Sequence, residues 1–473
     1  MLAALLGLAS SARAQVPDCP PVEPGIDLPG EPAEDGAAPT VLVVIPKDAS
    51  GAISTAGLEL APGAQIVDSR FSPLLCATIA RVTGAPGASP ASLILQLPEN
   101  AAAVPDDEYA PESEPDVSPV AAAPEAEKPD PYRKQQWALD ALGVDAAHAV
   151  TRGENARVAV LDTRANDEHA DLASIHVAGG TSARAGQHGT LVAGIIAAVR
   201  GNGVGIVGVA PRAALVSIPV CEATARGDVC RLYAVVNGLD LAWGERAQIV
   251  NLSLVGPANR VLERAVRRLD TLGVAVVAAS GNRPGSAPAF PAAYPWVIGV
   301  AASDRSGRLA PSGPVVDLTA PGVEIVSTSA NGGYAFASGS SLAAAQTSAA
   351  LALLTSASSG DVASARRALF GAARRMNATA PPALAPLCDA LAKLERPCHP
   401  IEGSAPTQTP LNAALVPAPR GNSISSIAVP SGSARKNIFT PPTSIGFCSG
   451  TSPRARHAAC AASRSSTDSE MFE

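Results

Sequence analysis

The sequence predicts an α/β fold, a three-layer sandwich with a mostly parallel central sheet, from about residue 132 to residue 398. Apolar runs of strand length alternate there with stretches of helical periodicity, a pattern typical of strands joined by right-handed crossovers. The strand runs also lack regular polar alternation, as expected of a sheet covered on both faces. The expected strands are Val158–Leu161, Ala214–Val220, Ile249–Leu254, Val274–Ala279 and Val297–Ala301, and the expected helices are Thr190–Val199, Leu232–Glu245 and Val261–Leu272.

The N-terminal 14 residues, MLAALLGLASSARA, have an apolar centre and end in the small-x-small pattern Ala12-Arg13-Ala14. This pattern predicts an export signal over residues 1–14, although the basic flank that usually precedes the apolar run is absent. A short buried helix is the alternative. No other segment offers the ~20 apolar residues that a membrane-spanning helix needs. A secreted or periplasmic protein without a membrane span is therefore expected.

Three further segments flank the predicted sandwich. Residues 35–98 are expected to form a small α+β unit, with strand-like runs at Val41–Ile45 and Leu93–Leu97. Residues 99–131 are rich in proline, alanine and acid, a composition that buries too little apolar surface to fold, so an exposed linker is expected. Residues 399–473 are rich in Ser, Pro, Ala and Thr and are expected to be a disordered tail.

Charge and cysteine content limit the class of protein further. The net charge is −7 and no basic patch is evident, so nucleic acid is not expected as a partner. Eight cysteines, most of them in close pairs, favour disulfides in an oxidising compartment over reduced buried thiols. The spacing within these pairs is too wide for a zinc motif. The close pairs are Cys221 with Cys230, Cys388 with Cys398, and Cys448 with Cys460.

Three chemically complementary residues follow one another along the predicted sandwich. Asp162 ends the apolar run Val158–Leu161, His188 opens a helical stretch, and Ser341 lies where a glycine-bearing turn runs into an alanine-rich helix. A carboxylate, an imidazole and a hydroxyl at the ends of regular elements suggest nucleophilic acyl transfer. Their order along the chain, Asp, His, Ser, is one of the known triad orders.

Each of these residues also has a structural explanation. A serine at a helix start is usually an N-cap, and Ser340 is a competing nucleophile. A histidine on an apolar helix is usually part of the core, and Asp162 can cap a neighbouring turn. Asn282, which follows a predicted strand, can be a turn residue or an amide donor to an oxyanion. The four residues together, each in its sequence context, support a catalytic site more strongly than any one of them does.

Five segments across residues 132–398 resemble those of the subtilisin-like serine proteases (subtilases, peptidase family S8). These segments are VAVLDT, HGTLVAG, NLSL, AASGN and SGSSLAAA. The resemblance implies a subtilisin-like sandwich, a triad of Asp162, His188 and Ser341, and Asn282 as the oxyanion donor. It also implies an exported, monomeric endopeptidase that cleaves extended polypeptides and requires no cofactor.

The resemblance also implies how substrate binds. Ser253, Leu254 and Val255 would form an edge strand that pairs with an extended peptide backbone. Ala279 and Gly281 would join them as substrate-binding residues. The loop between Cys221 and Cys230 would form the opposite wall of the cleft, and the unit over residues 35–98 resembles a propeptide that blocks the cleft with its C-terminal stretch.

The sequence departs from the family pattern at several positions. Arg164 stands two residues after the triad aspartate, where glycine is usual, and adds a long cation there. The segment after Ser341 lacks the usual proline and histidine. Val255 stands where glycine is common, which suggests a narrower cleft. None of these changes removes a reacting atom.

Calcium is expected only as a possible structural ion. Asp171 lies in a segment that resembles the one where relatives place a calcium-ligating aspartate, and Asn202 lies in a nearby loop able to offer further oxygens. Calcium needs six to eight oxygen ligands, and the sequence identifies fewer.

Two rival functions remain open at this stage. One is a catalytically silent protein that keeps the cleft to hold extended peptides. The other is a lipase or esterase, which is disfavoured because no G-x-S-x-G elbow surrounds Ser341 and the triad order differs. For an endopeptidase, the short, proline-rich stretch Arg283–Tyr294 predicts a shallow primary pocket for small or medium apolar side chains.

Overall fold

The computed structural model describes residues 24–29, 31, 37–47, 58–112, 130–179, 184–225, 227–314, 316–375 and 381–398. The expected signal (1–14) and tail (399–473) lie outside the described residues. Most of the expected linker, residues 113–129, also lies outside them.

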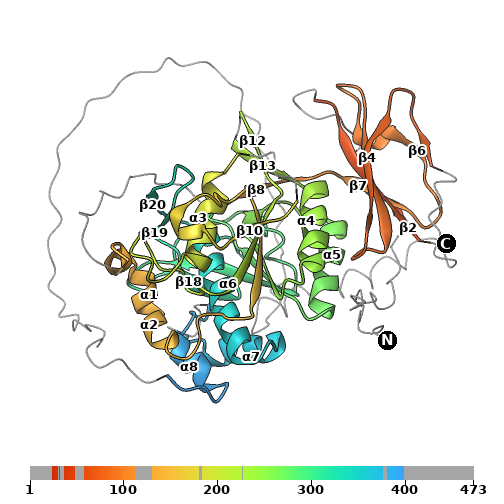
Figure 1. The fold of residues 1–473 in the computed structure, drawn as a ribbon. Coiled ribbons are helices and arrows are strands. Elements are labelled where there is room, and N and C mark those ends of the chain that lie inside the picture. Colours follow the sequence, from red (N-terminus) through yellow and green to blue (C-terminus); the bar gives the residue numbers. More distant parts are fainter. Residues whose placement is uncertain are drawn as a thin grey trace, which may run out of the picture. The chain divides into compact units, whose positions relative to one another are not determined.

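A seven-stranded parallel sheet forms the centre of the predicted sandwich (Figure 1), in the order β10-β11-β9-β14-β16-β17-β18. Its inner strands are buried along their whole length, which explains why their sequences are apolar without alternation. The expected strands are confirmed, with Leu254 assigned to a separate short strand. The bounds are β9 Arg157–Asp162, β10 His176–Val177, β11 Ala214–Pro219, β14 Ile249–Leu252, β16 Ala275–Ala279, β17 Val297–Ser303 and β18 Leu318–Pro321.

Helices cover both faces of this sheet, as the α/β prediction requires. On one face α3 (Gln187–Ala197) and α6 (Ser340–Ala357) share a core with four further helices. On the other face α4 (Leu232–Gly244) packs beside α5 (Arg260–Thr271) in a second core. α6 is buried over 16 of its 18 residues, because its alanines and serines allow close approach to the sheet. The four further helices are α1 Trp137–Ala141, α2 Val144–Ala147, α7 Val362–Ala372 and α8 Leu387–Ala392.

An N-terminal unit precedes the sandwich and is built on a five-stranded sheet in the order β1-β7-β2-β5-β4. It extends beyond the expected bounds of 35–98 at both ends. Its described residues contain strands and one 3₁₀ helix, so the α+β assignment stays a prediction. The bounds are β1 Gly25–Ile26, β2 Thr40–Pro46, β3 Glu59–Leu60, β4 Gln65–Ser72, β5 Ala77–Thr83, η1 Pro90–Leu93, β6 Ile94–Gln96 and β7 Ala102–Pro105.

The central strand of this unit, β2, is buried on both faces. Val41, Val43 and Ile45 pack in a small core within the unit. Leu42 and Val44 point the other way and join the core that contains α4 and α5. The unbroken apolar run in the sequence therefore reflects packing of the N-terminal unit against the sandwich.

Residues 102–111 differ from the exposed linker expected there. After β7, strand β8 (Glu108–Pro111) lies between β13 (Gly227–Arg231) and β15 (Leu254–Val255) and is antiparallel to both. The side chain of Tyr109 is buried, with 1% of its surface exposed. Neighbouring strands supply the hydrogen bonds and apolar contacts that this acid-rich segment lacks by itself.

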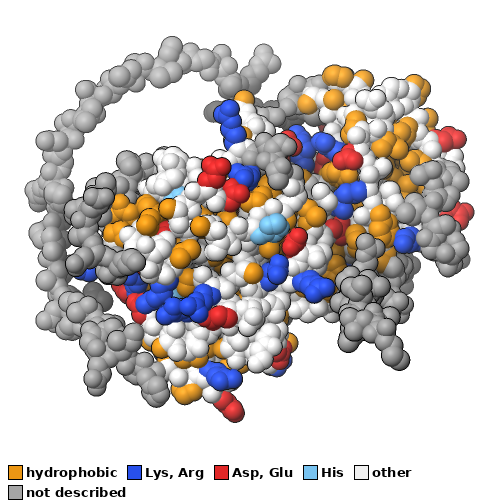
Figure 2. Space-filling view, in the orientation of Figure 1, with side chains coloured by type: hydrophobic (Ala, Val, Ile, Leu, Met, Phe, Trp, Pro, Cys, Tyr) orange, Lys and Arg blue, Asp and Glu red, His pale blue; other side chains and the backbone are white. Residues whose placement is uncertain are grey.

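Two disulfides have both of their cysteines among the described residues. Cys221 pairs with Cys230 across the hairpin of β12 (Glu222–Thr224) and β13, and Cys388 of α8 pairs with Cys398. Among the described helices, none is both long and apolar enough to cross a bilayer. On the face drawn in Figure 2, acidic side chains lie among the basic ones.

Candidate active site

Asp162 and His188 form a buried pair at the carboxyl end of the sheet. Asp162 is the last residue of β9, His188 is the second residue of α3, and the two are 1% and 6% exposed. The two carboxylate oxygens of Asp162 lie 2.7 and 2.8 Å from Nδ1 of His188. Because Nδ1–H donates to the carboxylate, the neutral ring carries its free lone pair on Nε2. Nε2 is buried and has no hydrogen-bond partner among the described residues.

Thr163 positions the Asp162–His188 pair, a role that the sequence alone did not indicate. Its backbone N–H donates to Oδ1 of Asp162 at 2.6 Å, and its hydroxyl accepts from the N–H of Gly189 at 2.8 Å. A Cβ at Gly189 would lie 2.0 Å from the carbonyl oxygen of Thr163. Only glycine therefore allows the two segments to approach this closely. In the sequence, the glycine that follows His188 was the one feature that could have indicated this contact.

Ser341 lies at the start of α6 and is fully buried. The preceding turn depends on Gly339, whose φ of 155° is unfavourable for other residues. The Ser341 hydroxyl donates to the carbonyl oxygen of Glu112 at 2.6 Å and lies 3.1 Å from that of Ser253. The competing Ser340 is also buried, but its hydroxyl has no hydrogen-bond partner in the described chain. The geometry therefore favours Ser341 as the nucleophile.

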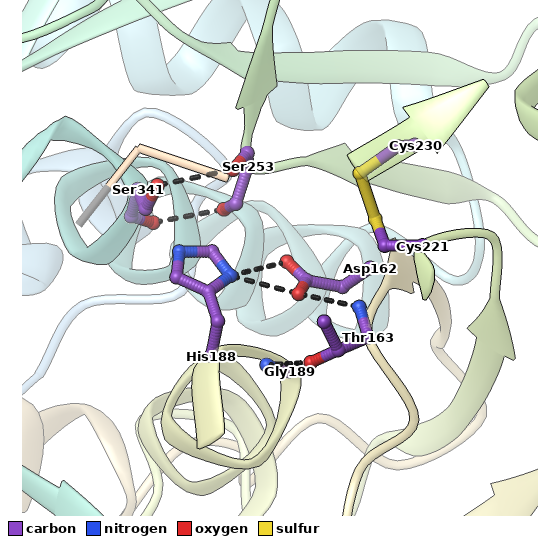
Figure 3. Close-up of a disulfide and its surroundings, with 8 residues drawn as sticks. All are labelled: Asp162, Thr163, His188, Gly189, Cys221, Cys230, Ser253 and Ser341. Atoms are coloured by element: carbon purple, nitrogen blue, oxygen red, sulfur yellow. Dashed lines mark hydrogen bonds and ion pairs between the residues drawn. A yellow bond between two sulfur atoms is a disulfide. The ribbon is translucent and has the colours of Figure 1, made fainter. Parts of the chain in front are cut away.

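Figure 3 shows the imidazole of His188 between the carboxylate of Asp162 and the side chain of Ser341. Three segments that are far apart in the sequence thus meet at one site. A hydroxyl, an unprotonated ring nitrogen and a buried carboxylate in this arrangement can perform nucleophilic attack with proton transfer.

Two donors converge on the same carbonyl as the Ser341 hydroxyl. Nδ2 of Asn282 donates to the carbonyl oxygen of Glu112 at 3.2 Å, and the backbone N–H of Ser341 does so at 3.3 Å. Oδ1 of Asn282 accepts from the N–H of Ser340 at 2.9 Å, which fixes the amide so that its NH₂ group faces the carbonyl. Such a pair of donors can stabilise negative charge that develops on that oxygen.

The residues expected to bind substrate border the same site. Ser253 accepts from the N–H of Glu112 at 3.3 Å, while Leu254 and Val255 pair with Pro111 and Ala110. Ala279 ends β16, and Gly281 follows with a φ of 88°. A Cβ at Gly281 would lie 3.6 Å from Cβ of Ala289 and 4.0 Å from Cγ1 of Val255, which are ordinary van der Waals contacts, so the positive φ rather than crowding favours glycine there.

The hairpin closed by Cys221 and Cys230 pairs with β8 on the side opposite β15. Cys230 pairs with Tyr109 across the β13–β8 ladder, so β8 is bound on both sides. The hairpin also carries Asp228, whose pKa is raised by burial and by repulsion from Asp162, while attraction to His188 opposes the rise.

Arg164 does not add an unpaired cation to the site. Its guanidinium donates to Oδ1 of Asp167 at 2.6 Å, and its side chain is 18% exposed. The half-buried carboxylate of Asp167, three residues further along the chain, therefore binds the arginine that replaces the usual glycine.

Asp171 and Asn202, the two expected calcium ligands, come together in the described fold. Nδ2 of Asn202 donates to Oδ1 of Asp171, while the N–H of Ile206 and the hydroxyl of Tyr334 donate to Oδ2. Both carboxylate oxygens therefore accept hydrogen bonds in this arrangement, whereas calcium needs oxygens that are free to coordinate it. Calcium binding at Asp171 stays a prediction.

Sequence reasoning also missed Glu112 and Tyr109, which occupy the cleft. One signal was available, because Tyr109 is the only aromatic residue in the acid-rich stretch 99–131. An isolated aromatic in a polar segment often anchors that segment to a pocket.

Comparison with known proteins gives consistent matches over the sandwich. A family model described as "Subtilase family" matches residues 153–383, a range that contains Asp162, His188, Asn282 and Ser341. Thermitase from Thermoactinomyces vulgaris is 36% identical over 226 residues, which cover 45% of this chain and 80% of that protein. Subtilisin BL from Lederbergia lenta is 36% identical over 231 residues, covering 46% of this chain and 83% of that protein. The minor extracellular protease Epr from Bacillus subtilis (strain 168) is 37% identical over 234 residues, covering 46% of this chain and 35% of that protein.

Proposed function

The chain belongs to the subtilase family and is a serine-type endopeptidase, and on that premise we propose that Ser341, His188 and Asp162 form its catalytic triad. One observation carries the proposal: the His188–Asp162 pair lies beside a hydroxyl that contacts a backbone carbonyl at 2.6 Å. The substrates are extended polypeptide segments.

In the proposed reaction, Oγ of Ser341 attacks the carbonyl carbon of the substrate while Nε2 of His188 takes the hydroxyl proton. Asp162 stabilises the resulting imidazolium. The C–N bond then breaks, and the leaving amine receives that proton, which leaves an ester on Ser341. Water attacks the ester with His188 again as the base, and the acid product departs. No cofactor is required for these steps.

The proposed oxyanion donors are Nδ2 of Asn282 and the backbone N–H of Ser341. The support is that both donate to one oxygen, at 3.2 and 3.3 Å, and that this oxygen also accepts from the proposed nucleophile. Substrate would bind as β8 does, as a strand between β13 and β15. Main-chain hydrogen bonds would supply affinity, and pockets for alternate side chains would supply selectivity.

The N-terminal unit is proposed to be an inhibitory propeptide, supported by its contacts with α4 and α5. Oδ1 of Asp106 accepts from the N–H of Tyr233 at 2.9 Å, and the carbonyl of Asp107 accepts from Leu232 at 2.8 Å. α4 has no side-chain cap of its own, so these acids satisfy N–H groups that a helix start leaves unpaired. Negative charge there also complements the helix dipole.

Secretion or transfer to the periplasm is proposed on two grounds. The N-terminal 14 residues have the pattern of an export signal. Two disulfides are formed in the described residues, and disulfides persist in oxidising compartments.

Labelling with a fluorophosphonate probe tests the proposed function. An activated serine reacts with the probe, and peptide mass mapping of the processed protein is expected to find the adduct on Ser341. The rival function, a silent peptide-binding protein, predicts no labelling even when the cleft is free. An adduct on Ser340 alone would overturn the assignment of the nucleophile.

Replacing Asp228 with asparagine is expected to shift the acid limb of the pH–activity profile to lower pH. The ionised Asp228 attracts the imidazolium form of His188, and catalysis needs the neutral ring. Removing the negative charge therefore removes this stabilisation of the imidazolium form. Partial exposure of Asp228 keeps the effect small.

The shift is measured from kcat/KM at low salt and again at high salt. Screening by salt should shrink the difference between Asp228→Asn and the unmodified enzyme. A shift to higher pH would contradict the prediction.

A further inference from the structure

Glu112, a residue of the protein's own N-terminal region, lies in the cleft in the manner of a substrate. β8 is paired on both sides, and the N–H of Glu112 continues the pairing by donating to Ser253 at 3.3 Å. The Glu112 carbonyl accepts from the hydroxyl and the N–H of Ser341 and from Nδ2 of Asn282. The nucleophile and both proposed oxyanion donors thus converge on one peptide carbonyl.

The side chain of Glu112 is recognised as well. Its Oε2 accepts from the backbone N–H of Asn282 at 3.1 Å. Hydrogen bonds to an ionised acceptor are stronger than those to a neutral one. The same asparagine therefore contacts both the reacting carbonyl, through its side chain, and the adjacent carboxylate, through its main chain.

The charge of the surrounding segments suits a carboxylate. Residues 253–257 and 279–290 contain no acidic side chain and one basic one, Arg283. Arg283 directly follows Asn282 and is exposed. An ionised glutamate therefore meets a hydrogen-bond donor that is followed in the chain by a cation, with no carboxylate from these two segments to repel it.

Tyr109 fixes the register of this segment three residues before Glu112. Its hydroxyl donates to the carbonyl of Pro257 at 3.2 Å. A Cβ at Gly256 would lie 2.3 Å from the Tyr109 ring, so this glycine makes room for the ring. A buried aromatic anchor of this kind holds the carbonyl of Glu112 at the nucleophile.

From these contacts we infer that the primary pocket of this enzyme selects glutamate, and that the bond from Glu112 to Ser113 is the processing site in its own chain. The inference rests on the proposed function. Ser341 forms an ester with the Glu112 carbonyl, and the C–N bond to Ser113 breaks. The proton taken up by His188 passes to the new amine of Ser113, and water then hydrolyses the ester. This selectivity differs from the apolar preference that the proline-rich stretch suggests.

The processing site is tested by producing the full chain and its Ser341→Ala variant in the same host and sequencing the N-termini. The expected result is a mature chain that starts at Ser113 in the first case and no such product in the second. If the enzyme digests casein but its mature chain starts elsewhere, the inference fails and the proposed function stands. If cleavage at Ser113 persists in Ser341→Ala, self-processing is overturned.

Selectivity is tested on the mature enzyme with fluorogenic peptides that end in Tyr-Ala-Pro-Glu, or carry Gln, Phe or Lys in place of Glu, before the scissile bond. Glu is expected to exceed the isosteric Gln by about tenfold or more in kcat/KM, since only Glu offers a charged acceptor. Faster cleavage after Phe or Lys than after Glu would overturn the inference.

Arg283→Ala is expected to lower the Glu-to-Gln ratio by about threefold to tenfold at low salt, because it removes the nearby cation. Arg375→Ala is the matched control. It removes an exposed arginine that follows α7, and the ratio should not change. Equal effects of the two variants would show that Arg283 does not recognise the negative charge of the substrate glutamate.

Discussion

Ser341→Ala is expected to lower kcat on casein by about 10⁶-fold, the scale seen when the nucleophile of a serine triad is removed. The hydroxyl that contacts the carbonyl in the cleft is lost, and no group in the described site replaces it. Binding should change little, because the N–H of Ser341 and the amide of Asn282 remain. Single-turnover and steady-state rates on the processed enzyme check this expectation.

Ser340→Ala provides the matched control. Ser340 neighbours Ser341 and is equally buried, but its hydroxyl has no partner in the described chain, and its N–H, which binds Asn282, survives the substitution. Activity within a few-fold of the unmodified enzyme is expected. Loss of activity in Ser340→Ala with retention in Ser341→Ala would reverse the assignment of the two serines. The Ser341→Ala protein must be supplied in processed form, because the variant is not expected to process itself.

Asp240→Ala is expected to weaken binding of the cleaved N-terminal unit by about 10²- to 10³-fold, because the half-buried Arg70 and two neighbouring donors lose their acceptor. Asp240 lies on α4 and accepts from Arg70 at 2.7 Å, Ser72 Oγ at 3.0 Å and Leu74 N–H at 3.1 Å. Burial raises the pKa of Asp240, so desolvation opposes the ionised state of this pair. The predicted loss therefore arises mainly from the donors left without an acceptor.

Dilution of the processed mixture measures this binding, because casein hydrolysis appears as the bound unit dissociates. For Asp240→Ala, activity should appear at about 10²- to 10³-fold higher protein concentration. Asp270→Ala is the control, since Asp270 lies on the adjacent α5 but pairs with Arg366 of the sandwich. An equal shift in both variants would indicate general destabilisation of the helices and would contradict a specific role for Asp240.

The proposed inhibitor, its proposed cleavage site and the enzyme all belong to one chain. Acids in the N-terminal region serve three distinct purposes. Asp106 caps α4, Asp107 accepts from Asn259 at the start of α5, and Glu112 occupies the cleft. These three described acids are therefore accounted for by the starts of two helices and by the proposed carboxylate-binding pocket.

Local sequence determined the sandwich and the residue types of the site. Buried parallel strands need continuous apolar runs, and the chain shows them at β9, β14 and β16. The carboxyl ends of such strands lie at one edge of the sheet, so Asp162 and Asn282 could be expected there. Gly189, next to His188, marked a close approach that no other residue allows, and Gly339, two residues before Ser341, marked a turn with a φ unfavourable for other residues.

Only the tertiary structure decided which groups meet. From its own sequence the acid-rich stretch looks unable to fold, because the strands that β8 pairs with, β13 and β15, lie more than a hundred residues away in the chain. The same is true of Asp171, whose oxygens are taken by Tyr334 and Ile206, donors that its local sequence does not reveal. Periodicity and propensity report a segment's own preferences, whereas hydrogen bonds between distant segments depend on the packed fold. For this protein, the sequence determined the proposed catalytic groups, and the fold determined that the chain's own glutamate lies against them.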